Sequence, residues 1–370
     1  MLKSFEIINL LKARNLNFIS GVPCSIFKDF LIELNNDSDF QHLSATSEGE
    51  ACGLATGYYL ATAKLPIVYM QNSGLGNSVN PLTSLMDEKV YSIPAILFIS
   101  WRGEPGMADE PQHVKMGEIT IKLLETLGIE YQIADENVEK FEIQLDELTK
   151  LAFEKSRAVA LVFRKGIIEK NDKPKSQPQF TREQALEILL IKIGKAPIIS
   201  TTGKTSREIF ELREKYGQDH DSDFLTVGSM GCSASIGFSI AKNTDKPVFV
   251  IDGDGAVLMK MGTLATIGNY SAENFIHIVV DNSSYDSTGG QSTVSKILDW
   301  QKLFQAVGYK QCVIAQTSEQ LENLDITALK KPAAVIVKVD KGSRADLGRP
   351  TTTPNENKQN FMKFIQSQLI

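Results

Sequence analysis

Residues 248–291 read VFVIDGDGAVLMKMGTLATIGNYSAENFIHIVVDNSSYDSTGGQ and contain two uninterrupted apolar runs. The first run, Val248–Ile251, stops at an Asp-Gly-Asp-Gly turn, and the second, Phe275–Val280, stops at Asp281-Asn282. The residues between the runs have a helical pattern. Short apolar runs that stop at turn residues are typical of buried strands, so the stretch predicts a strand, a crossover helix and a second parallel strand.

The two predicted strand ends carry small and polar residues. Gly253-Asp254-Gly255 follows the first strand, and Asn282-Ser283-Ser284 follows the second. The 25 residues between Gly255 and Asp281 (280 − 256 + 1 = 25) suffice for a right-handed crossover, so both carboxyl ends should lie close together. Oxygen donors there can hold Mg²⁺ or Ca²⁺, and glycine lets backbone N–H groups approach a phosphate. We therefore expect a metal and diphosphate site, a description that also fits many other phosphate-binding proteins.

Length and composition exclude several classes of protein. A chain of 370 residues predicts two domains, and its net charge of −6 gives no basic field for nucleic acid. No stretch approaches the ~18 apolar residues of a membrane span, and the charged amphipathic N-terminus is unlike a signal peptide. The four cysteines, Cys24, Cys52, Cys232 and Cys312, lack metal-ligand spacing. We interpret them as reduced core thiols of a cytoplasmic protein.

The order of predicted elements gives the fold class. Apolar strands and helices alternate from Ser4 to Arg164, and the alternation restarts at Thr181 after a polar, proline-bearing segment. We expect an α/β protein with two doubly wound parallel-sheet domains. Their predicted bounds are 1–168 and 181–370, joined by a linker at 169–180. We find no close sequence repeat between the halves, which leaves duplication an open question.

Two polar segments of the first half have structural as well as functional interpretations. Ser47 and Glu50 match the S-x-x-E capping box, which explains Glu50 as a structural residue. Glu48 could simply complement the dipole of the helix that starts there. The glycine- and amide-rich segment Gln71–Asn77 is predicted as a strand-end loop, which could line a site or serve only as a turn.

In these features the chain resembles the thiamine diphosphate (ThDP) dependent decarboxylases. That family has a GDG motif followed by Asn after roughly 25 to 30 residues, which matches Gly253–Gly255 and Asn282. It also has a glutamate followed by Gly-Tyr about ten positions later, which matches Glu48 and Gly57-Tyr58. The resemblance is closest to the family's phosphonopyruvate and sulfopyruvate decarboxylase branch and covers nearly the whole chain. The matching segments are Gly21–Pro23, Gln71–Leu82, Trp101–His113, Thr201–Arg207, Gly228–Gly231, Ser287–Gln291 and Lys341–Pro354.

The resemblance implies ThDP and Mg²⁺ as cofactors and a role for each matching residue. Asp254, the Asn282 side chain and the Ser284 carbonyl would bind Mg²⁺, which bridges the two phosphates. Glu48 would donate a proton to the aminopyrimidine, which requires a carboxyl that shares a proton at neutral pH. Met230 would support the bent cofactor, or else be an ordinary core methionine. The remaining implied cofactor-binding residues are Asn72, Gly228, Ser229, Gly253, Gly255 and Ala256.

The resemblance also implies a reaction and a substrate class. The expected function is decarboxylation of 3-phosphonopyruvate to phosphonoacetaldehyde and CO₂ in phosphonate biosynthesis of the 2-aminoethylphosphonate type. Conversion of sulfopyruvate to sulfoacetaldehyde and a non-catalytic ThDP-fold protein are the alternatives. His113 is the candidate for proton transfer, although a lone histidine is more often only hydrogen-bonded. The candidates for binding the distal anion are Ser25, Arg102, Lys115, Arg344 and Arg349, each of which could instead be a solvated surface residue. A homo-oligomer with active sites between subunits is expected.

Overall fold

The computed structural model describes residues 1–170 and 179–367, which group into two compact units. The first unit contains the residues up to 170 together with residues 287–291, and the second contains residues 179–286 and 292–367. Most of the predicted linker, residues 171–178, lies outside the described residues. None of the described helices has the length and apolar character needed to cross a bilayer.

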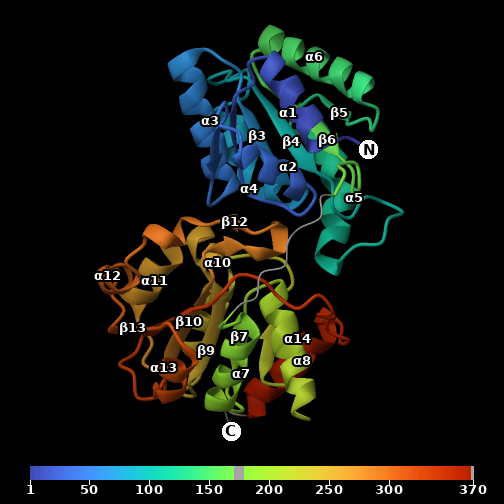
Figure 1. Cartoon of the computed structure of the whole chain (residues 1–370). Helices are drawn as coiled ribbons and strands as arrows, with labels where there is room; N and C mark the ends of the chain where they lie inside the picture. Colours follow the sequence, from blue (N-terminus) through green and yellow to red (C-terminus); the bar gives the residue numbers. More distant parts are fainter. Residues whose placement is uncertain (171–178, 368–370) are drawn as a thin grey trace. The chain divides into compact units, whose positions relative to one another are not determined.

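The first unit is built on one parallel six-stranded sheet (Figure 1). Its strands are β1 (Phe18–Gly21), β2 (Gln41–Ser44), β3 (Ile67–Gln71), β4 (Ala95–Ser100), β5 (Tyr131–Ile133) and β6 (Ala158–Phe163). They lie in the order β2-β1-β3-β4-β6-β5. The helices are α1 (Ser4–Ala13), α2 (Lys28–Asn35), α3 (Glu48–Thr62), α4 (Leu75–Ser84), α5 (Pro111–Thr126) and α6 (Val138–Lys155), with a short 3₁₀ turn, η1 (Asn72–Gly74).

The second unit contains another parallel six-stranded sheet. Its strands are β7 (Ile198–Ser200), β8 (Asp223–Leu225), β9 (Val248–Gly253), β10 (Phe275–Asp281), β13 (Gln311–Ala315) and β14 (Ala333–Lys338), in the order β13-β14-β10-β9-β7-β8. The helices are α7 (Arg182–Ile193), α8 (Lys204–Lys215), α9 (Ser233–Ala241), α10 (Asp254–Met259), α11 (Gly262–Tyr270), α12 (Trp300–Ala306), α13 (Ser318–Asn323) and α14 (Pro354–Ser367). Short elements are β11 (Ser284–Tyr285), η2 (Asp286–Thr288), β12 (Gln291–Ser292) and η3 (Val294–Ile297).

The two sheets have the same topology. If the six sheet strands of each unit are numbered from one, both sheets have the order 2-1-3-4-6-5. The predicted fold class, two doubly wound parallel α/β domains, is therefore confirmed. The shared strand order adds a structural likeness to two halves whose sequences show no close repeat.

Each sheet is covered by helices on both faces, which explains the uninterrupted apolar runs of its central strands. In β4 every residue is buried. Ile96 and Phe98 pack in one apolar cluster with α1, α2 and α6, whereas Leu97 and Ile99 pack in a second cluster with α3, α4 and α5. Because successive strand side chains point to opposite faces, such a strand needs apolar residues at every position.

Two predictions about the first unit need revision. The prediction of a loop over Gln71–Asn77 is wrong, because β3 extends through Gln71 and α4 begins at Leu75. Glycine and asparagine are weak helix formers, but burial of Leu75 and Leu82 overrides that preference. The capping box is confirmed only in part. Ser47 caps Glu50 N–H at 3.4 Å, while the Glu50 carboxylate accepts from the Thr46 N–H at 2.8 Å instead of from the Ser47 N–H.

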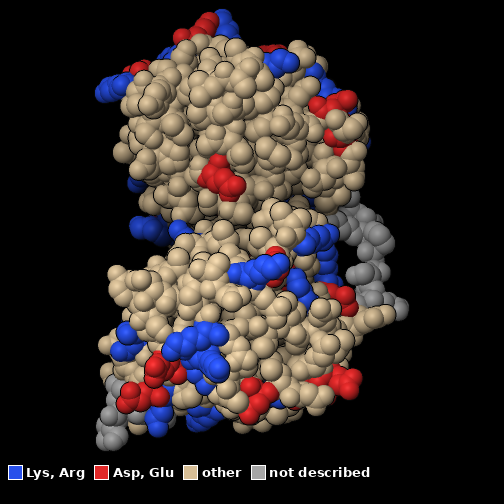
Figure 2. All heavy atoms as spheres, turned by 90° about the vertical axis from the view of Figure 1, so that its left-hand side faces the viewer, with Lys and Arg blue, Asp and Glu red and all other residues tan. Residues whose placement is uncertain are grey.

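The outer face of α3 is apolar and hollowed. A groove of about 680 Å³ lies beside this helix and the edge strand β2. Figure 2, which faces this side, shows a broad surface of the first unit with few charged side chains. Phe18 and Tyr58 stack in the groove with ring centroids 4.4 Å apart. The lining residues are Phe18, Gln41, Leu43, Glu50, Gly53, Leu54, Gly57, Tyr58, Ala61 and Thr62.

His42 on β2 should make stability depend on pH. Its ring nitrogens contact Asn35 Oδ1 at 2.7 Å and the Tyr69 hydroxyl at 2.9 Å, and burial lowers its pKa to about 4. A folded-state pKa below the unfolded value of about 6.5 means that the unfolded chain binds the proton first, so stability present above pH 6.5 is lost as the pH falls toward 4.

We expect the free energy of unfolding to fall by about 2 kcal/mol between pH 7 and pH 5 because of His42 alone. Urea unfolding of the wild type and of His42→Asn at both pH values measures this, because the variant lacks the titrating ring. Equal pH dependence in the two proteins would show that His42 is not the cause.

Candidate active site

The second unit brings the two predicted strand ends together. In the register of the adjacent strands β9 and β10, Val280 lies opposite Gly253. Thr293 then links the residues that follow, because its hydroxyl donates to the Asp254 carboxylate and its backbone N–H donates to the Ser283 carbonyl at 3.1 Å. The carboxyl ends of these parallel strands therefore place Asp254 beside the segment that starts at Asn282, as the sequence predicts.

Two buried carboxylates at this edge have opposite electrostatic environments. Burial and, to a smaller extent, the nearby negative charge of Asp281 raise the pKa of Asp254 to about 6. Burial also disfavours the charged form of Asp281, but hydrogen bonds from Lys338 and Trp300 hold the pKa of this carboxyl below its ordinary value. A divalent cation at Asp254 would compensate for the burial of its charge.

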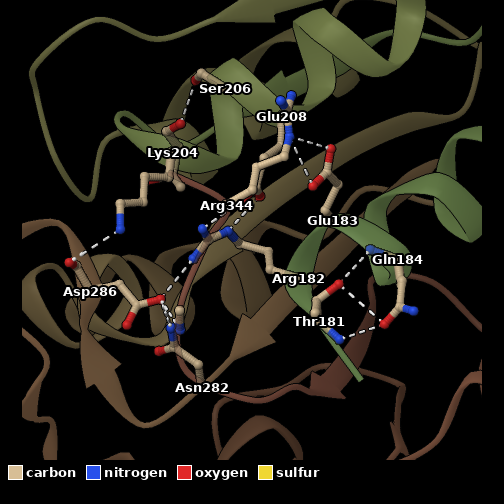
Figure 3. A network of polar contacts seen from close by, with 12 residues as sticks. Thr181, Arg182, Glu183, Gln184, Lys204, Ser206, Glu208, Asn282, Asp286 and Arg344 are labelled. Carbon is tan, nitrogen blue, oxygen red and sulfur yellow. Dashed lines mark hydrogen bonds and ion pairs between the residues drawn. The ribbon is translucent and has the colours of Figure 1, made fainter. Parts of the chain in front are cut away.

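The side chain of Asn282 has a defined orientation (Figure 3). Its Nδ2 donates to the Asp286 carboxylate at 2.8 Å, and its Oδ1 accepts from the Ser284 N–H at 2.9 Å. The Ser284 hydroxyl is buried and has no hydrogen-bond partner among the described residues. A buried, unsatisfied hydroxyl two residues after the Asn282 amide is a feature expected where a hydrophilic ligand binds.

The donors at this edge fit Mg²⁺ held jointly with a diphosphate. Asp254, Asn282 Oδ1 and a backbone carbonyl are hard oxygen ligands. Within residues 1–170 and 179–367, no three His, Cys, Asp or Glu side chains are grouped so that they could hold a metal ion. This edge therefore offers a partial coordination shell, which phosphate oxygens and water would complete.

Glycines give the neighbouring segment its shape. Gly228, Ser229 and Gly231 all have positive φ angles, of 73°, 47° and 85°. A Cβ atom on Gly255 would lie 2.7 Å from the Tyr285 ring and 3.4 Å from the Met230 methyl group. The predicted cofactor-binding segments 228–231 and 253–256 thus lie side by side in the second unit, with Met230 half-buried between solvent and Gly255.

A network of charged side chains surrounds Asp286 (Figure 3). Arg182 pairs with Glu208 through Nε at 2.6 Å and Nη2 at 2.8 Å, and its Nη1 contacts Asp286 at 3.2 Å. Arg182 and Glu208 are 7% and 1% exposed. A buried ion pair of this geometry holds both partners in one position.

Arg344 belongs to an outer part of the same region and is paired with acids. It contacts Glu183 at 3.0 Å and Asp346 at 3.3 Å, and it also pairs with Glu211. Three carboxylates compensate its charge, and the contact of Arg344 with substrate stays a prediction. Arg349 lies farther along the same segment and is exposed.

Glu48 in the first unit is buried at the first position of α3. It is 5% exposed, and its Oε2 accepts from Asn77 Nδ2 at 2.8 Å. A Cβ atom on Gly74 would lie 2.5 Å from Glu48 Oε1, so only glycine leaves room for this carboxyl. A residue that merely complements the helix dipole would be exposed. Burial and a dedicated amide donor favour the predicted catalytic role.

A second cluster of the first unit contains two predicted residues, Ser25 and Arg102. Arg102 donates from Nε to Asp109 at 2.7 Å, pairs with it again through Nη2, and donates from Nη1 to the Ser25 hydroxyl at 3.0 Å. Asp109 also accepts from two backbone N–H groups, and despite its partial burial these contacts hold its pKa well below the ordinary range. Ser25 and Arg102 follow the carboxyl ends of β1 and β4, the edge where ligands bind in such sheets.

His113 lies near this cluster, at the start of α5. Burial and the charge of Arg102 lower its pKa, so the ring is neutral at pH 7. Its Nδ1 is buried without a hydrogen-bond partner in the described part of the chain. Lys115 is two residues further on, so it projects from another face of the helix, where it is 79% exposed and pairs with Glu118 at 3.0 Å.

Asn72 is fully buried and is used within the first unit. Its Nδ2 donates to the Arg102 carbonyl at 2.8 Å and to Thr120 at 2.9 Å, and its Oδ1 accepts from the Arg102 N–H at 3.2 Å. These contacts use both N–H groups of the amide, and contact of Asn72 with a cofactor stays a prediction. Asn72 therefore fixes the backbone that carries Arg102.

Four residues that hold the candidate site in place were not predicted from the sequence. These are Asn77, which contacts Glu48; Asp109, which contacts Arg102; Thr293, which contacts Asp254; and Asp286, which contacts Asn282. Asn77 and Asp109 lie inside the segments that carry the family resemblance, so the resemblance could have been used to predict them. Thr293 lies outside them, and no sequence pattern indicated it.

The chain is similar to known proteins over nearly its whole length. The family model described as "Thiamine pyrophosphate enzyme, N-terminal TPP binding domain" matches residues 4–130, and the corresponding C-terminal TPP binding domain matches residues 202–339. A phosphonopyruvate decarboxylase of Streptomyces viridochromogenes is 34% identical, with 99% of this chain and 95% of the relative covered. One from Streptomyces hygroscopicus is 33% identical, with 98% and 94% covered. A sulfopyruvate decarboxylase of Methanosarcina acetivorans is 30% identical, with 78% of each chain covered.

Proposed function

The chain belongs to the thiamine diphosphate-dependent enzyme family, and we propose that it decarboxylates 3-phosphonopyruvate to phosphonoacetaldehyde and CO₂. The near-complete match to two phosphonopyruvate decarboxylases carries this choice. The product would be a precursor for phosphonates of the 2-aminoethylphosphonate type. We place the enzyme in the cytoplasm, for which its four free cysteines are the support.

ThDP, once bound with Mg²⁺, supplies the nucleophilic carbon and accepts the electrons released with CO₂. Asp254, Asn282 and the Ser284 carbonyl would hold the Mg²⁺, and the glycines of 228–231 would let the backbone approach the diphosphate. Glu48, fixed by Asn77, would exchange a proton with the aminopyrimidine ring. The protein's contribution is therefore to orient the cofactor and to hold one proton at Glu48.

The Arg102 cluster is the proposed binding site for the substrate's phosphonate. The side-chain contacts of Arg102 with Asp109 and Ser25 use three of its five N–H groups, which leaves two for an incoming anion. Asp109 keeps the guanidinium in place before substrate arrives, and Ser25 is exposed beside it. His113, neutral and with an unpartnered Nδ1 among the described residues, would give or accept the proton needed at the carbon that loses CO₂.

Two alternatives remain distinct from this proposal. Sulfopyruvate decarboxylation is favoured by the shorter match to a sulfopyruvate decarboxylase. Sulfonate also suits an arginine fork, although it carries less charge than phosphonate. A non-catalytic ThDP-binding protein would have no need for a buried Glu48 with its own amide donor.

A substrate panel tests the proposal directly. The enzyme with added ThDP and Mg²⁺ should show a higher kcat/KM for phosphonopyruvate than for sulfopyruvate or pyruvate, measured as aldehyde formed and CO₂ released. Preference for sulfopyruvate would establish the first alternative. Turnover of none of the three acids, with ThDP binding intact, would favour the second.

Self-association is part of the proposal. We propose a homodimer or larger oligomer in which the unit carrying Glu48 forms an active site together with the diphosphate-binding unit of another copy. The largely apolar face of α3 and its groove support an occupant that is a second copy of the chain, because apolar surfaces of this kind are usually covered (Figure 2).

Sedimentation equilibrium should accordingly give a mass of at least twice the 40.9 kDa of one chain. Ala61→Glu, which places a charge in the exposed groove, should shift the equilibrium toward monomer and lower activity at low protein concentration. Full activity in a monomeric wild type would contradict this arrangement.

A further inference from the structure

We propose that Asp286 is a positioning residue for Asn282, and that its carboxylate is the reason why position 282 carries an amide. This inference rests on the proposed role of Asn282 in holding Mg²⁺. Its basis is the contact of 2.8 Å from Asn282 Nδ2 to Asp286 Oδ2. Nothing in the motif that contains Asn282 indicates a need for this acid.

The contacts determine which end of the Asn282 amide is oxygen. Nδ2 faces a carboxylate, and Oδ1 faces the Ser284 N–H at 2.9 Å. Rotating the amide by 180° would set oxygen against the carboxylate and NH₂ against the N–H, which replaces two hydrogen bonds with two repulsive contacts. Oδ1 accepts one hydrogen bond in this orientation, so a second lone pair remains for a metal ion.

Asp286 is itself held firmly. The same Oδ2 accepts from Arg182 Nη1 at 3.2 Å and from the Gly342 N–H at 3.0 Å, and the Asp286 carbonyl accepts from Lys204 Nζ at 3.4 Å. Arg182 is fixed in turn by its buried pair with Glu208 (Figure 3). The anchor for Asn282 is therefore built from segments that are far apart in the sequence, and the whole set lies in the second unit.

The charge of Asp286 also restricts the residue type at position 282. Carboxylates are ordinary Mg²⁺ ligands, so aspartate would be chemically suitable there. In this structure its carboxylate would replace an NH₂ group 2.8 Å from the Asp286 oxygen, and two like charges at that distance repel. Asparagine supplies the metal-binding oxygen and a donor to Asp286 at the same time.

The test is a double-mutant cycle on Mg²⁺ binding by the full-length enzyme. Isothermal titration calorimetry with Mg²⁺, at fixed ThDP and without substrate, gives the Mg²⁺ dissociation constant for the wild type, Asp286→Ala, Asn282→Asp and the double variant. We expect Asp286→Ala to weaken Mg²⁺ binding by about 10- to 100-fold, as is usual for residues that orient metal ligands. Asn282→Asp should weaken it as well.

The double variant gives the decisive result. An aspartate at position 282 has two equivalent oxygens, so it does not need Asp286 to decide which of them faces the metal ion. In the Asn282→Asp background, removal of the Asp286 carboxylate takes away a like charge, so the double variant should bind Mg²⁺ more tightly than Asn282→Asp alone. The effect of Asp286→Ala thus reverses its sign between the two backgrounds. A purely structural role would weaken binding in both backgrounds, and that outcome would overturn the proposal.

Two further variants guard against trivial explanations. Asp286→Asn keeps an oxygen that can accept from Asn282, so it should retain Mg²⁺ binding within about tenfold of the wild type, and a loss equal to that of Asp286→Ala would count against the proposal. The melting temperature of each metal-free variant shows whether it folds. If Asp286→Ala does not fold, Asp286→Asn replaces it in the test. Asp325→Asn, at an exposed turn of the same unit, controls for the loss of one charge. Failure of the proposed substrate would leave all these binding constants unchanged.

Discussion

Glu48→Gln enzyme is expected to bind ThDP and Mg²⁺ like the wild type and to lose about 10²- to 10⁴-fold in kcat. Glutamine has the shape of glutamate, and its Oε1 can still accept from Asn77 Nδ2, which lies 2.8 Å from the carboxylate. It cannot release a proton to the aminopyrimidine. Calorimetric ThDP titration together with steady-state assay of CO₂ release separates binding from turnover.

The neighbouring acid Glu50 provides a matched control for Glu48. It lies in the same first turn of α3, but its carboxylate accepts from Thr46, and it contributes to capping the helix. Glu50→Gln should keep kcat within a few-fold of the wild type and lower stability by about 1 kcal/mol at most. Unchanged turnover in Glu48→Gln would refute the assigned catalytic role.

Arg102→Ala should lower kcat/KM for phosphonopyruvate by about 10²- to 10³-fold, because a charged partner of the substrate's anion is lost. Activity toward pyruvate, which has no distal anion, should change much less. Arg102→Lys should give an intermediate loss, since a single ammonium cannot engage both Asp109 oxygens and Ser25 in the present geometry. Kinetic constants for both acids measure this selectivity.

Arg14 is the appropriate control for Arg102. It also pairs with an aspartate through Nε and Nη2, at 2.7 and 2.9 Å from Asp146, but on the surface of the same unit. Arg14→Ala should leave kcat/KM for every substrate unchanged. An equal loss for pyruvate and phosphonopyruvate in Arg102→Ala would mean that Arg102 supports the fold and not the anion site.

Much of the fold could be predicted from local sequence, because parallel strands buried on both faces read as apolar runs. The predicted strands Val248–Ile251 and Phe275–Val280 are both present in the structure, where they are two residues and one residue longer than predicted. The prediction of a loop over Gln71–Asn77 failed, because packing stabilises the helix Leu75–Ser84 although glycine, asparagine and an internal proline disfavour it. Such burial depends on residues distant in the chain.

The candidate site was predictable where its residues follow strand ends directly. Asp254 and Asn282 stand in one contiguous motif, and their proximity follows from the crossover rule. The role of Arg344 could not be judged from sequence, because the three carboxylates that compensate it come from Glu183, Glu211 and Asp346. Glu183 and Glu211 are far from Arg344 in the sequence, so their contacts with it appear only in the folded structure.

The fixed amide of Asn282 also bears on the chemical lifetime of the enzyme. Asparagine followed by a small residue such as Ser283 ages by deamidation, which begins when the next backbone nitrogen attacks the side-chain carbonyl carbon. Here the Ser283 nitrogen donates to Asp281 Oδ1 at 2.8 Å, while both ends of the Asn282 amide are engaged. Because deamidation would create a carboxylate against Asp286, the hydrogen bonds that orient this side chain also protect the enzyme from gradual self-inactivation.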